Sequence, residues 1–268
     1  MDVAAFKEGQ KTIWSLGEFA DIAAMIRGAS ETILDKAAVS AGDTVLDVAC
    51  GTGNLAIPAA QRGAIVTAID ITPKLVEICR AEAAAKGLDI TIEEGDAEAL
   101  EPADASFDKV ISVFGMIFAP QHELAAAEMV RVAKPGGTVA ITSWALDGMN
   151  GEMFKVIGQH MPPPPSDMKT PAMWGEESYI EEAFGGEIDW SFSRETVTFH
   201  AQSAAEWTAF MEEKLGPLVL AKSMLEPEGR FDALRDDLTA HYEKHNVADD
   251  GTFAGEASYI LAVGVTPR

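Results

Sequence analysis

Short apolar segments alternate with amphipathic stretches between residues 43 and 144, and this alternation constrains the fold more than any other feature of the sequence. Strand-like runs stand at 44–50, 64–70, 89–96, 107–115 and 137–144, with helical stretches such as 73–86 and 120–133 between them. Strands that alternate with helices form a parallel sheet covered by helices on both faces. The sequence therefore predicts an α/β core.

The segments on either side of this core have a different pattern. Apolar residues at helical spacing, broken near Gly28, predict two helices before the first strand. After Trp144 the alternation stops, and "MPPPPSDMKTP" (161–171) predicts a stiff link. Two more strands are expected at 187–200 and 258–267, and Ser203 and Glu206 match a capping box in the helical stretch between them. We therefore expect a mainly parallel seven-stranded sheet with a helical cap inserted after the fifth strand.

Composition excludes several classes of function. The chain has 43 acidic and 20 basic residues, a net charge of −23 that would repel a phosphate backbone, so nucleic acid is not an expected partner. Cys50 and Cys79 are too far apart in the sequence for a redox pair and too few for a disulfide framework. Neither a signal-like start nor a long apolar segment is present, so we expect a cytoplasmic protein without membrane insertion.

A glycine turn in "VLDVACGTGNLA" (45–56) joins the first strand to a helix. Such a turn lets the backbone approach a ligand closely, and the first turn of the helix offers free amide groups. Gly51, Gly53 and Ala56, with Asp70 further on, also satisfy a loose dinucleotide-binding fingerprint. A nicotinamide-dependent oxidoreductase therefore stays open, as does a tight turn with no ligand.

Further signals follow at the ends of the other strands, where open α/β sheets bind their ligands. Asp47 lies in the end of the first strand, and Asp70 ends the second. "GDAEAL", "SVFG" and "RVAKPGG" follow in order, the first two at the ends of the third and fourth strands and the last leading into the fifth. The ordered set indicates one ligand-binding edge.

Across residues 43–144 the sequence resembles the class I S-adenosylmethionine-dependent methyltransferases, particularly the ubiquinone/menaquinone C-methyltransferase-like branch. The first motif of that family runs acidic-x-Gly-x-Gly-x-Gly, and here it reads Asp47-Val48-Ala49-Cys50-Gly51-Thr52-Gly53. Ala49 replaces the first glycine, and the turn could accommodate the added methyl group. The resemblance implies a Rossmann-like fold and S-adenosyl-L-methionine as the cofactor.

By this resemblance, Asp70 would bind both ribose hydroxyls, because a carboxylate offers two acceptor oxygens to a vicinal diol. Asp96 would accept from the adenine amino group. Trp14 would close over the cofactor as part of an N-terminal segment. The cofactor-binding residues implied are Asp47, Cys50, Gly51, Thr52, Gly53, Asp70, Ile71, Asp96, Ala97, Val113, Phe114 and Trp14. On the residues alone, Asp47 as a turn cap, Asp70 as the start of an Asx-turn and Asp96 as a loop carboxylate remain open.

Methyl transfer from a sulfonium is an in-line displacement, so positioning can supply much of the catalysis and a base is optional. His122 and His160 are the candidate bases. A methionine-rich region between residues 149 and 173 predicts either an apolar lid or ordinary core packing. The candidate acceptor-binding residues are Met116, Phe118, Trp144, Met149, Met153 and Phe154. The fourth strand carries no acidic cluster, so we expect no metal.

The resulting hypothesis is an enzyme that methylates a small apolar or aromatic molecule, with a homodimer left open. Its parts would be an N-terminal helical lid (1–40), a cofactor-binding core (41–146), a substrate-cap insertion (147–185) and a C-terminal region (186–268) that completes the sheet and the acceptor pocket. Two alternatives remain: the oxidoreductase, and a methyltransferase-like fold that binds the cofactor for other chemistry.

Overall fold

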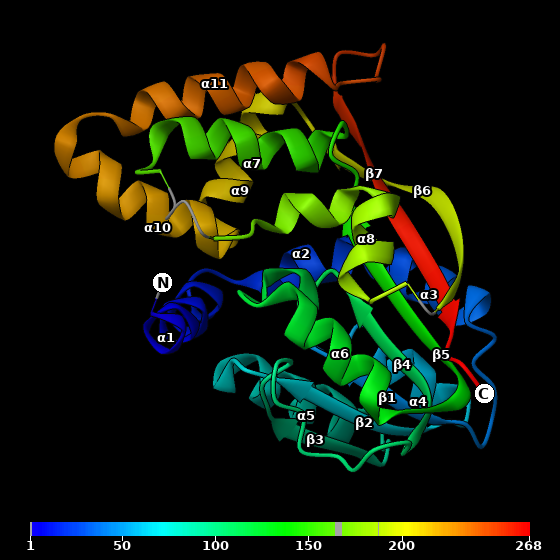
Figure 1. Ribbon diagram of the computed structural model, residues 1–268. Helices are drawn as coiled ribbons and strands as arrows, with labels where there is room; N and C mark the ends of the chain where they lie inside the picture. Colours follow the sequence, from blue (N-terminus) through cyan, green and yellow to red (C-terminus); the bar gives the residue numbers. More distant parts are fainter. Residues whose placement is uncertain (1, 164–167, 187) are drawn as a thin grey trace.

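A seven-stranded sheet forms the centre of the computed structural model, which describes residues 2–163, 168–186 and 188–268 (Figure 1). The strand order is β3-β2-β1-β4-β5-β7-β6. The strands are β1 (Thr44–Val48), β2 (Ile65–Asp70), β3 (Ile90–Glu94), β4 (Phe107–Val113), β5 (Ala133–Trp144), β6 (Asp189–Ala201) and β7 (Phe253–Val265). Pairing is parallel from β3 to β5 and antiparallel at β5–β7 and β7–β6. The predicted mainly parallel seven-stranded sheet is confirmed.

Three helices precede β1, where the sequence predicted two: α1 (Val3–Ser15), α2 (Phe19–Met25) and α3 (Arg27–Lys36). The break between α2 and α3 falls at Ile26 rather than near Gly28. The other helices of the sheet layers are α4 (Ala56–Gln61), α5 (Pro73–Ala85), α6 (His122–Val132) and α8 (Glu177–Ala183), with short 3-10 turns η1 (Met116–Phe118) and η2 (Pro171–Gly175).

The two faces of the sheet support separate hydrophobic clusters, because successive strand residues point to opposite sides. Val45 and Ile111 face the cluster that contains the buried side chains of α3, α4 and α5. Leu46 and Val110, their neighbours along β1 and β4, face the cluster that contains those of α6 and α8. Helices therefore cover both faces, as predicted.

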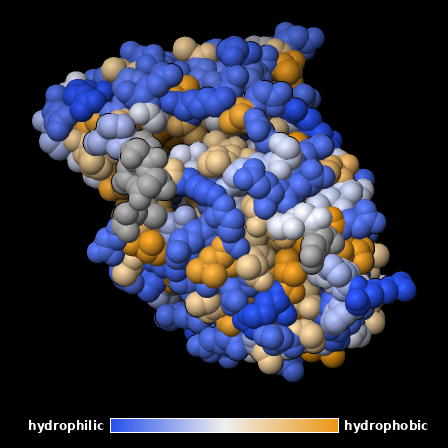
Figure 2. All heavy atoms as spheres, viewed as in Figure 1, coloured by the Kyte–Doolittle hydropathy of each residue, from blue (hydrophilic) through white to orange (hydrophobic). Residues whose placement is uncertain are grey.

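A helical cap stands above one end of the sheet (Figure 1). It combines α7 (Met149–His160), which follows β5, with α9 (Ala204–Lys214), α10 (Gly216–Leu225), η3 (Glu226–Glu228) and α11 (Phe231–Lys244), which lie between β6 and β7. The face of the cap that is visible in Figure 2 is mostly hydrophilic. The cap thus draws on two separate stretches of chain, and α8 packs on the sheet instead.

The predicted capping box is present at the start of α9. The Ser203 hydroxyl accepts from the Glu206 amide at 3.1 Å, and the Glu206 carboxylate accepts from the Gln202 amide at 2.7 Å. Four residues of the predicted proline-rich link, 164–167, lie outside the described residues, as does residue 187 of the expected sixth strand. Within the described part of the chain, no helix has the length and apolar character needed to cross a membrane.

Candidate functional site

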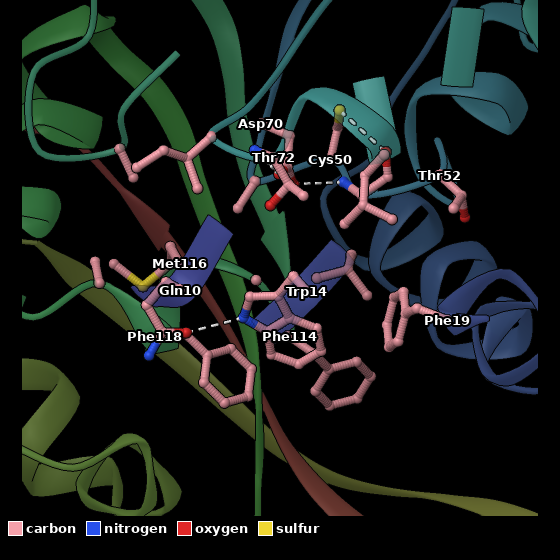
Figure 3. A pocket seen from close by; sticks show the side chains of 18 of the residues that line it. Gln10, Trp14, Phe19, Cys50, Thr52, Asp70, Thr72, Phe114, Met116 and Phe118 are labelled. Carbon is pink, nitrogen blue, oxygen red and sulfur yellow. Dashed lines mark hydrogen bonds between the residues drawn. The ribbon is translucent and has the colours of Figure 1, made fainter. Parts of the chain in front are cut away.

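A pocket opens where the loops after β1, β2, β3 and β4 meet the N-terminal helices (Figure 3). Its empty volume, including the open mouth, is about 930 Å³. Ten of the twelve predicted cofactor residues line it: Trp14, Cys50, Gly51, Thr52, Asp70, Ile71, Asp96, Ala97, Val113 and Phe114. The edge of the sheet predicted from the sequence is therefore the edge that carries the pocket.

Asp47 and Gly53 are the two predicted cofactor residues that do not line the pocket. Asp47 is 1% exposed, and its carboxylate accepts from the Ala56 amide at 2.9 Å at the start of α4. Burial raises the pKa of Asp47 to about 8, against the lowering effect of that hydrogen bond. Asp47 therefore holds the turn by capping α4, the simpler of the two alternatives that the sequence left open.

Gly53 supports packing rather than a ligand. Its φ is +90°, and a Cβ at this position would lie 2.7 Å from the Cys79 sulfur and 3.1 Å from Ile57 Cδ1. The thiols of Cys50 and Cys79 also interact, and this contact together with burial raises the pKa of Cys50. The two cysteines are distant in the sequence but close in space, because α5 brings Cys79 beneath the turn, and both are free thiols.

Ala49, which departs from the family motif, has a left-handed backbone with φ of 57°. This conformation costs an L-residue about 1–2 kcal/mol relative to glycine. Gly115 makes room for the methyl group, because a Cβ on Gly115 would lie 2.6 Å from the Ala49 Cβ and 2.4 Å from the Ala49 carbonyl oxygen. The expected accommodation of the methyl group thus depends on a glycine in the loop after β4.

Asp70 lies at the end of β2 with 6% of its surface exposed. Its carboxylate accepts from the Gly51 amide at 2.9 Å and from the Thr72 amide at 2.8 Å (Figure 3). Burial raises its pKa, and the two amide contacts oppose that rise. The Thr72 side chain also hydrogen-bonds to this carboxylate. Since a carboxylate has about four acceptor positions, about one remains for a ligand.

Asp96 is held by a lysine that sequence reasoning missed. Lys7 lies 2.6 Å from the Asp96 carboxylate and 2.5 Å from that of Glu98, and it lines the pocket from α1. The Asp96 carboxylate also accepts from the Glu98 amide at 2.9 Å. Lys7, Gln10 and Trp14 are spaced by three and four residues and so share one helix face. Because Trp14 was already a predicted pocket residue, this spacing could have predicted Lys7 and Gln10 as well.

Aromatic side chains form another wall of the pocket (Figure 3). Trp14 packs edge-on against Phe118, with ring centroids 4.8 Å apart, and against Phe19 at 5.3 Å. The Trp14 indole donates to the Gln10 side chain at 3.0 Å. Met116 and Phe118, both predicted at the acceptor site, line the pocket beside these rings. The wall combines flat apolar surfaces that suit a flat apolar molecule.

Phe114 lies between this pocket and the sheet. It has a left-handed φ of 56°, and its amide donates to the Thr142 hydroxyl at 3.0 Å. Trp144 stacks on the Phe114 ring at 4.0 Å and does not itself line the pocket. Backbone strain that the surroundings hold in place is typical of functional sites.

The structure separates the remaining acceptor candidates from the pocket. Met149 and Met153 are 0% and 2% exposed, and the Tyr242 hydroxyl lies 3.1 Å from the Met153 sulfur. Both therefore pack in the core of the cap, which is one of the two alternatives that the sequence left open; neither lies at the pocket, where they were proposed to bind the acceptor. Phe154 does not line the pocket either, although it approaches Phe118 with ring centroids 6.2 Å apart.

The two candidate bases also lie away from the pocket. His122 is buried against Trp174, with Nδ1 2.7 Å from the Tyr179 hydroxyl, and burial lowers its pKa to about 4. His160 pairs with Asp237 at 2.8 Å on the cap. Among the described residues that line the pocket, none is a histidine. Neither candidate is placed to accept a proton from a molecule bound there.

Comparison with known proteins adds evidence of kinship. Residues 45–137 match a family described as "Methyltransferase domain". A protein of Mycobacterium tuberculosis is 42% identical over 176 residues, which are 65% of this chain and 64% of that protein. The chain thus matches slightly less than two thirds of this relative's length. The demethylmenaquinone methyltransferase of Deinococcus radiodurans is 39% identical over 123 residues, 44% of this chain and 51% of that enzyme.

Among solved structures, the YcgJ protein from Bacillus subtilis superposes with a TM-score of 0.61 at 15% identity, over 90% of this chain and 99% of that one. This likeness establishes the shared fold of the whole architecture, including the strands beyond the matched family region.

Proposed function

We propose that this chain is a class I S-adenosylmethionine-dependent methyltransferase of the quinone methyltransferase-like branch, and that it transfers a methyl group from this cofactor to a small apolar or aromatic acceptor. The match of residues 45–137 to a methyltransferase domain and the similarity to a demethylmenaquinone methyltransferase support this proposal. One observation carries the proposal: the left-handed turn after β1, Asp70 after β2 and Asp96 after β3 line a single pocket. Amides, paired acceptors for a ribose diol and a carboxylate for an amine are the groups that such a nucleoside requires.

The pocket fits this cofactor on its own evidence. Gly51 has a φ of +55°, and a Cβ there would approach nothing nearer than Phe19 at 3.8 Å, so the turn faces open space. Asp70 keeps a free acceptor position although it is buried. Asp70 and Asp96 would hold the nucleoside, and the turn at residues 50–52 would hold the methionyl end. The cofactor, when bound, supplies an electrophilic methyl group on a sulfonium.

The sheet argues against the oxidoreductase alternative. Dinucleotide-binding sheets of the Rossmann type are ordered 3-2-1-4-5-6. Here an antiparallel β7 is inserted between β5 and β6. The glycine fingerprint occurs in both methyltransferases and nicotinamide-dependent oxidoreductases, but the strand order observed here differs from that of the dinucleotide-binding sheet.

The acceptor would lie against the aromatic wall. Trp14, Phe118 and Met116 offer apolar surface and exclude water from the displacement. The titratable side chains that line the described pocket are Lys7, Cys50, Asp70 and Asp96. Lys7 is ion-paired to Asp96. The contact with Cys79 and burial raise the pKa of Cys50, and burial raises the pKa of Asp70. We therefore propose that catalysis comes mainly from alignment of the acceptor with the methyl group rather than from a dedicated base.

Calorimetric titration tests the cofactor assignment. S-adenosylhomocysteine should bind with one site per chain, and NADH and NADPH should not. Asp70→Ala should abolish most of this binding, whereas Asp147→Ala, which removes a surface carboxylate paired with Arg194, should preserve it. Binding of NADH but not of the sulfur nucleoside would overturn the assignment.

Mass spectrometry tests the reaction. Incubation with S-adenosylmethionine and a panel of phenols and quinones should give a product heavier by one methylene for at least one apolar member. Cofactor binding with no methylated product across polar and apolar panels would favour the third alternative, a fold that uses the cofactor pocket for other chemistry.

A further inference from the structure

Two histidines and a glutamate meet in the cap, on the side of the molecule that the pocket does not use. Glu152 lies on α7, and His241 and His245 lie on α11. The His245 Nε2 is 2.9 Å from the Glu152 carboxylate, and the His241 Nδ1 is 4.0 Å from the same oxygen. One ligand atom from each residue lies within 4.8 Å of the other two. None of the three lines the pocket.

The spacing suits a small cation. His241 and His245 are four residues apart and so point from one helix face, with ring centroids 4.7 Å apart. Around tetrahedral Zn²⁺ with bonds of about 2.0–2.1 Å, ligand atoms are separated by roughly 3.3 Å. The observed separations bracket this value, and small rotations of the side chains would close the site.

His241 is oriented as metal-binding histidines usually are. Its side chain is 5% exposed, and its Nε2 lies 2.8 Å from the Met149 carbonyl oxygen. Because a carbonyl can only accept, Nε2 carries the proton and Nδ1 presents its lone pair toward Glu152. Metal-bound histidines commonly donate their second N–H to a carbonyl or carboxylate in this way.

We propose that Glu152, His241 and His245 form a binding site for a divalent transition metal ion of the Zn²⁺ type. Two imidazole nitrogens and one carboxylate oxygen make a common zinc ligand set, which leaves a fourth position for water. The ion would join α7 to α11 and so connect the two separate stretches of the cap. Lys244, 3.0 Å from the Glu152 carboxylate, competes for the same oxygen, but its side chain is 67% exposed and free to turn outward.

The test is a titration of tag-free, chelator-treated protein with Zn²⁺ and, for its absorption spectrum, Co²⁺. We expect one ion per chain, a rise in melting temperature, and visible Co²⁺ bands typical of a low coordination number. Glu152→Gln and His245→Ala should each weaken binding at least about tenfold. Lys244→Met should strengthen it, because the competing charge is gone.

His160→Ala is the matched control. His160 also joins α7 to α11, through Asp237 at 2.8 Å, but no third ligand joins this pair among the described residues. The control should bind Zn²⁺ as the parent does. Glu152 and His245 are partly exposed, so their variants should fold, which circular dichroism without metal verifies. Absence of stoichiometric binding in the parent, or equal affinity in His245→Ala and the parent, would overturn the proposal.

Discussion

Replacement of Gly53 by alanine should destabilise the fold far more than the same change at Gly51, although both glycines belong to one motif. Both have positive φ, +90° and +55°. They differ in their surroundings: the added Cβ at Gly53 would overlap the Cys79 sulfur at 2.7 Å, and at Gly51 the nearest atom is 3.8 Å away.

The structure sets the magnitudes. A left-handed conformation costs alanine about 1–2 kcal/mol, which applies to both positions. Overlap with the buried Cys79 side chain and with the half-buried Ile57 side chain adds about 1–3 kcal/mol at Gly53 only. We therefore expect a loss of about 2–5 kcal/mol for Gly53→Ala and about 1–2 kcal/mol for Gly51→Ala.

Urea unfolding of both variants in the parent and in Cys79→Ala measures the difference as a double-mutant cycle. Removal of the Cys79 sulfur should recover the part of the Gly53→Ala loss of stability that comes from the overlap, about 1–3 kcal/mol. The loss of stability in Gly51→Ala should be unchanged. Gly51→Ala should instead weaken S-adenosylhomocysteine binding, since Gly51 lines the pocket and Gly53 does not.

Equal destabilisation by the two alanines would refute this reasoning. It would mean that backbone strain alone matters and that the contact of Gly53 with α5 does not. If Cys79→Ala does not reduce the loss of stability caused by Gly53→Ala, the added methyl group does not overlap the Cys79 sulfur.

Three further predictions follow from the same geometry. Asp70→Ala should weaken binding of S-adenosylhomocysteine by about 10- to 150-fold, equivalent to about 1.5–3 kcal/mol for hydrogen bonds to a charged group; unchanged calorimetric affinity in the folded variant would remove Asp70 from the site. Met149→Ala should cost about 2–5 kcal/mol of stability, because the side chain is fully buried, and should leave cofactor affinity unaltered; altered turnover at full stability would return Met149 to the acceptor site. The pKa of His122 is depressed from 6.5 to about 4, so the unfolded chain binds a proton that the folded one excludes, and stability should fall by about 2 kcal/mol between pH 6.5 and pH 4. In His122→Asn this loss of stability between pH 6.5 and pH 4 should be smaller. Urea unfolding at both pH values measures it, and a loss as large as that of the parent would contradict the prediction.

Local patterns in the sequence determined the sheet core and the edge that carries the pocket. Alternating strands and helices specify a parallel sheet because each element must bury an apolar face. Asp70, Asp96 and Phe114 line the pocket because the carboxyl ends of parallel strands meet at one edge. These inferences need only the order of residues along the chain and the geometry of the elements.

Tertiary structure alone decided which side chains meet across long stretches of sequence. Lys7 reaches Asp96 because α1 packs against α5 and α10, and Cys79 lies beneath the turn because α5 packs on β2 and β3. The cap assembles α7 and α11 from either side of β6, which buries Met149 instead of exposing it to the pocket. The same packing brings Glu152 to His241 and His245. Such contacts depend on which apolar faces pack together in three dimensions. The periodicity of a single segment does not predict its packing partner.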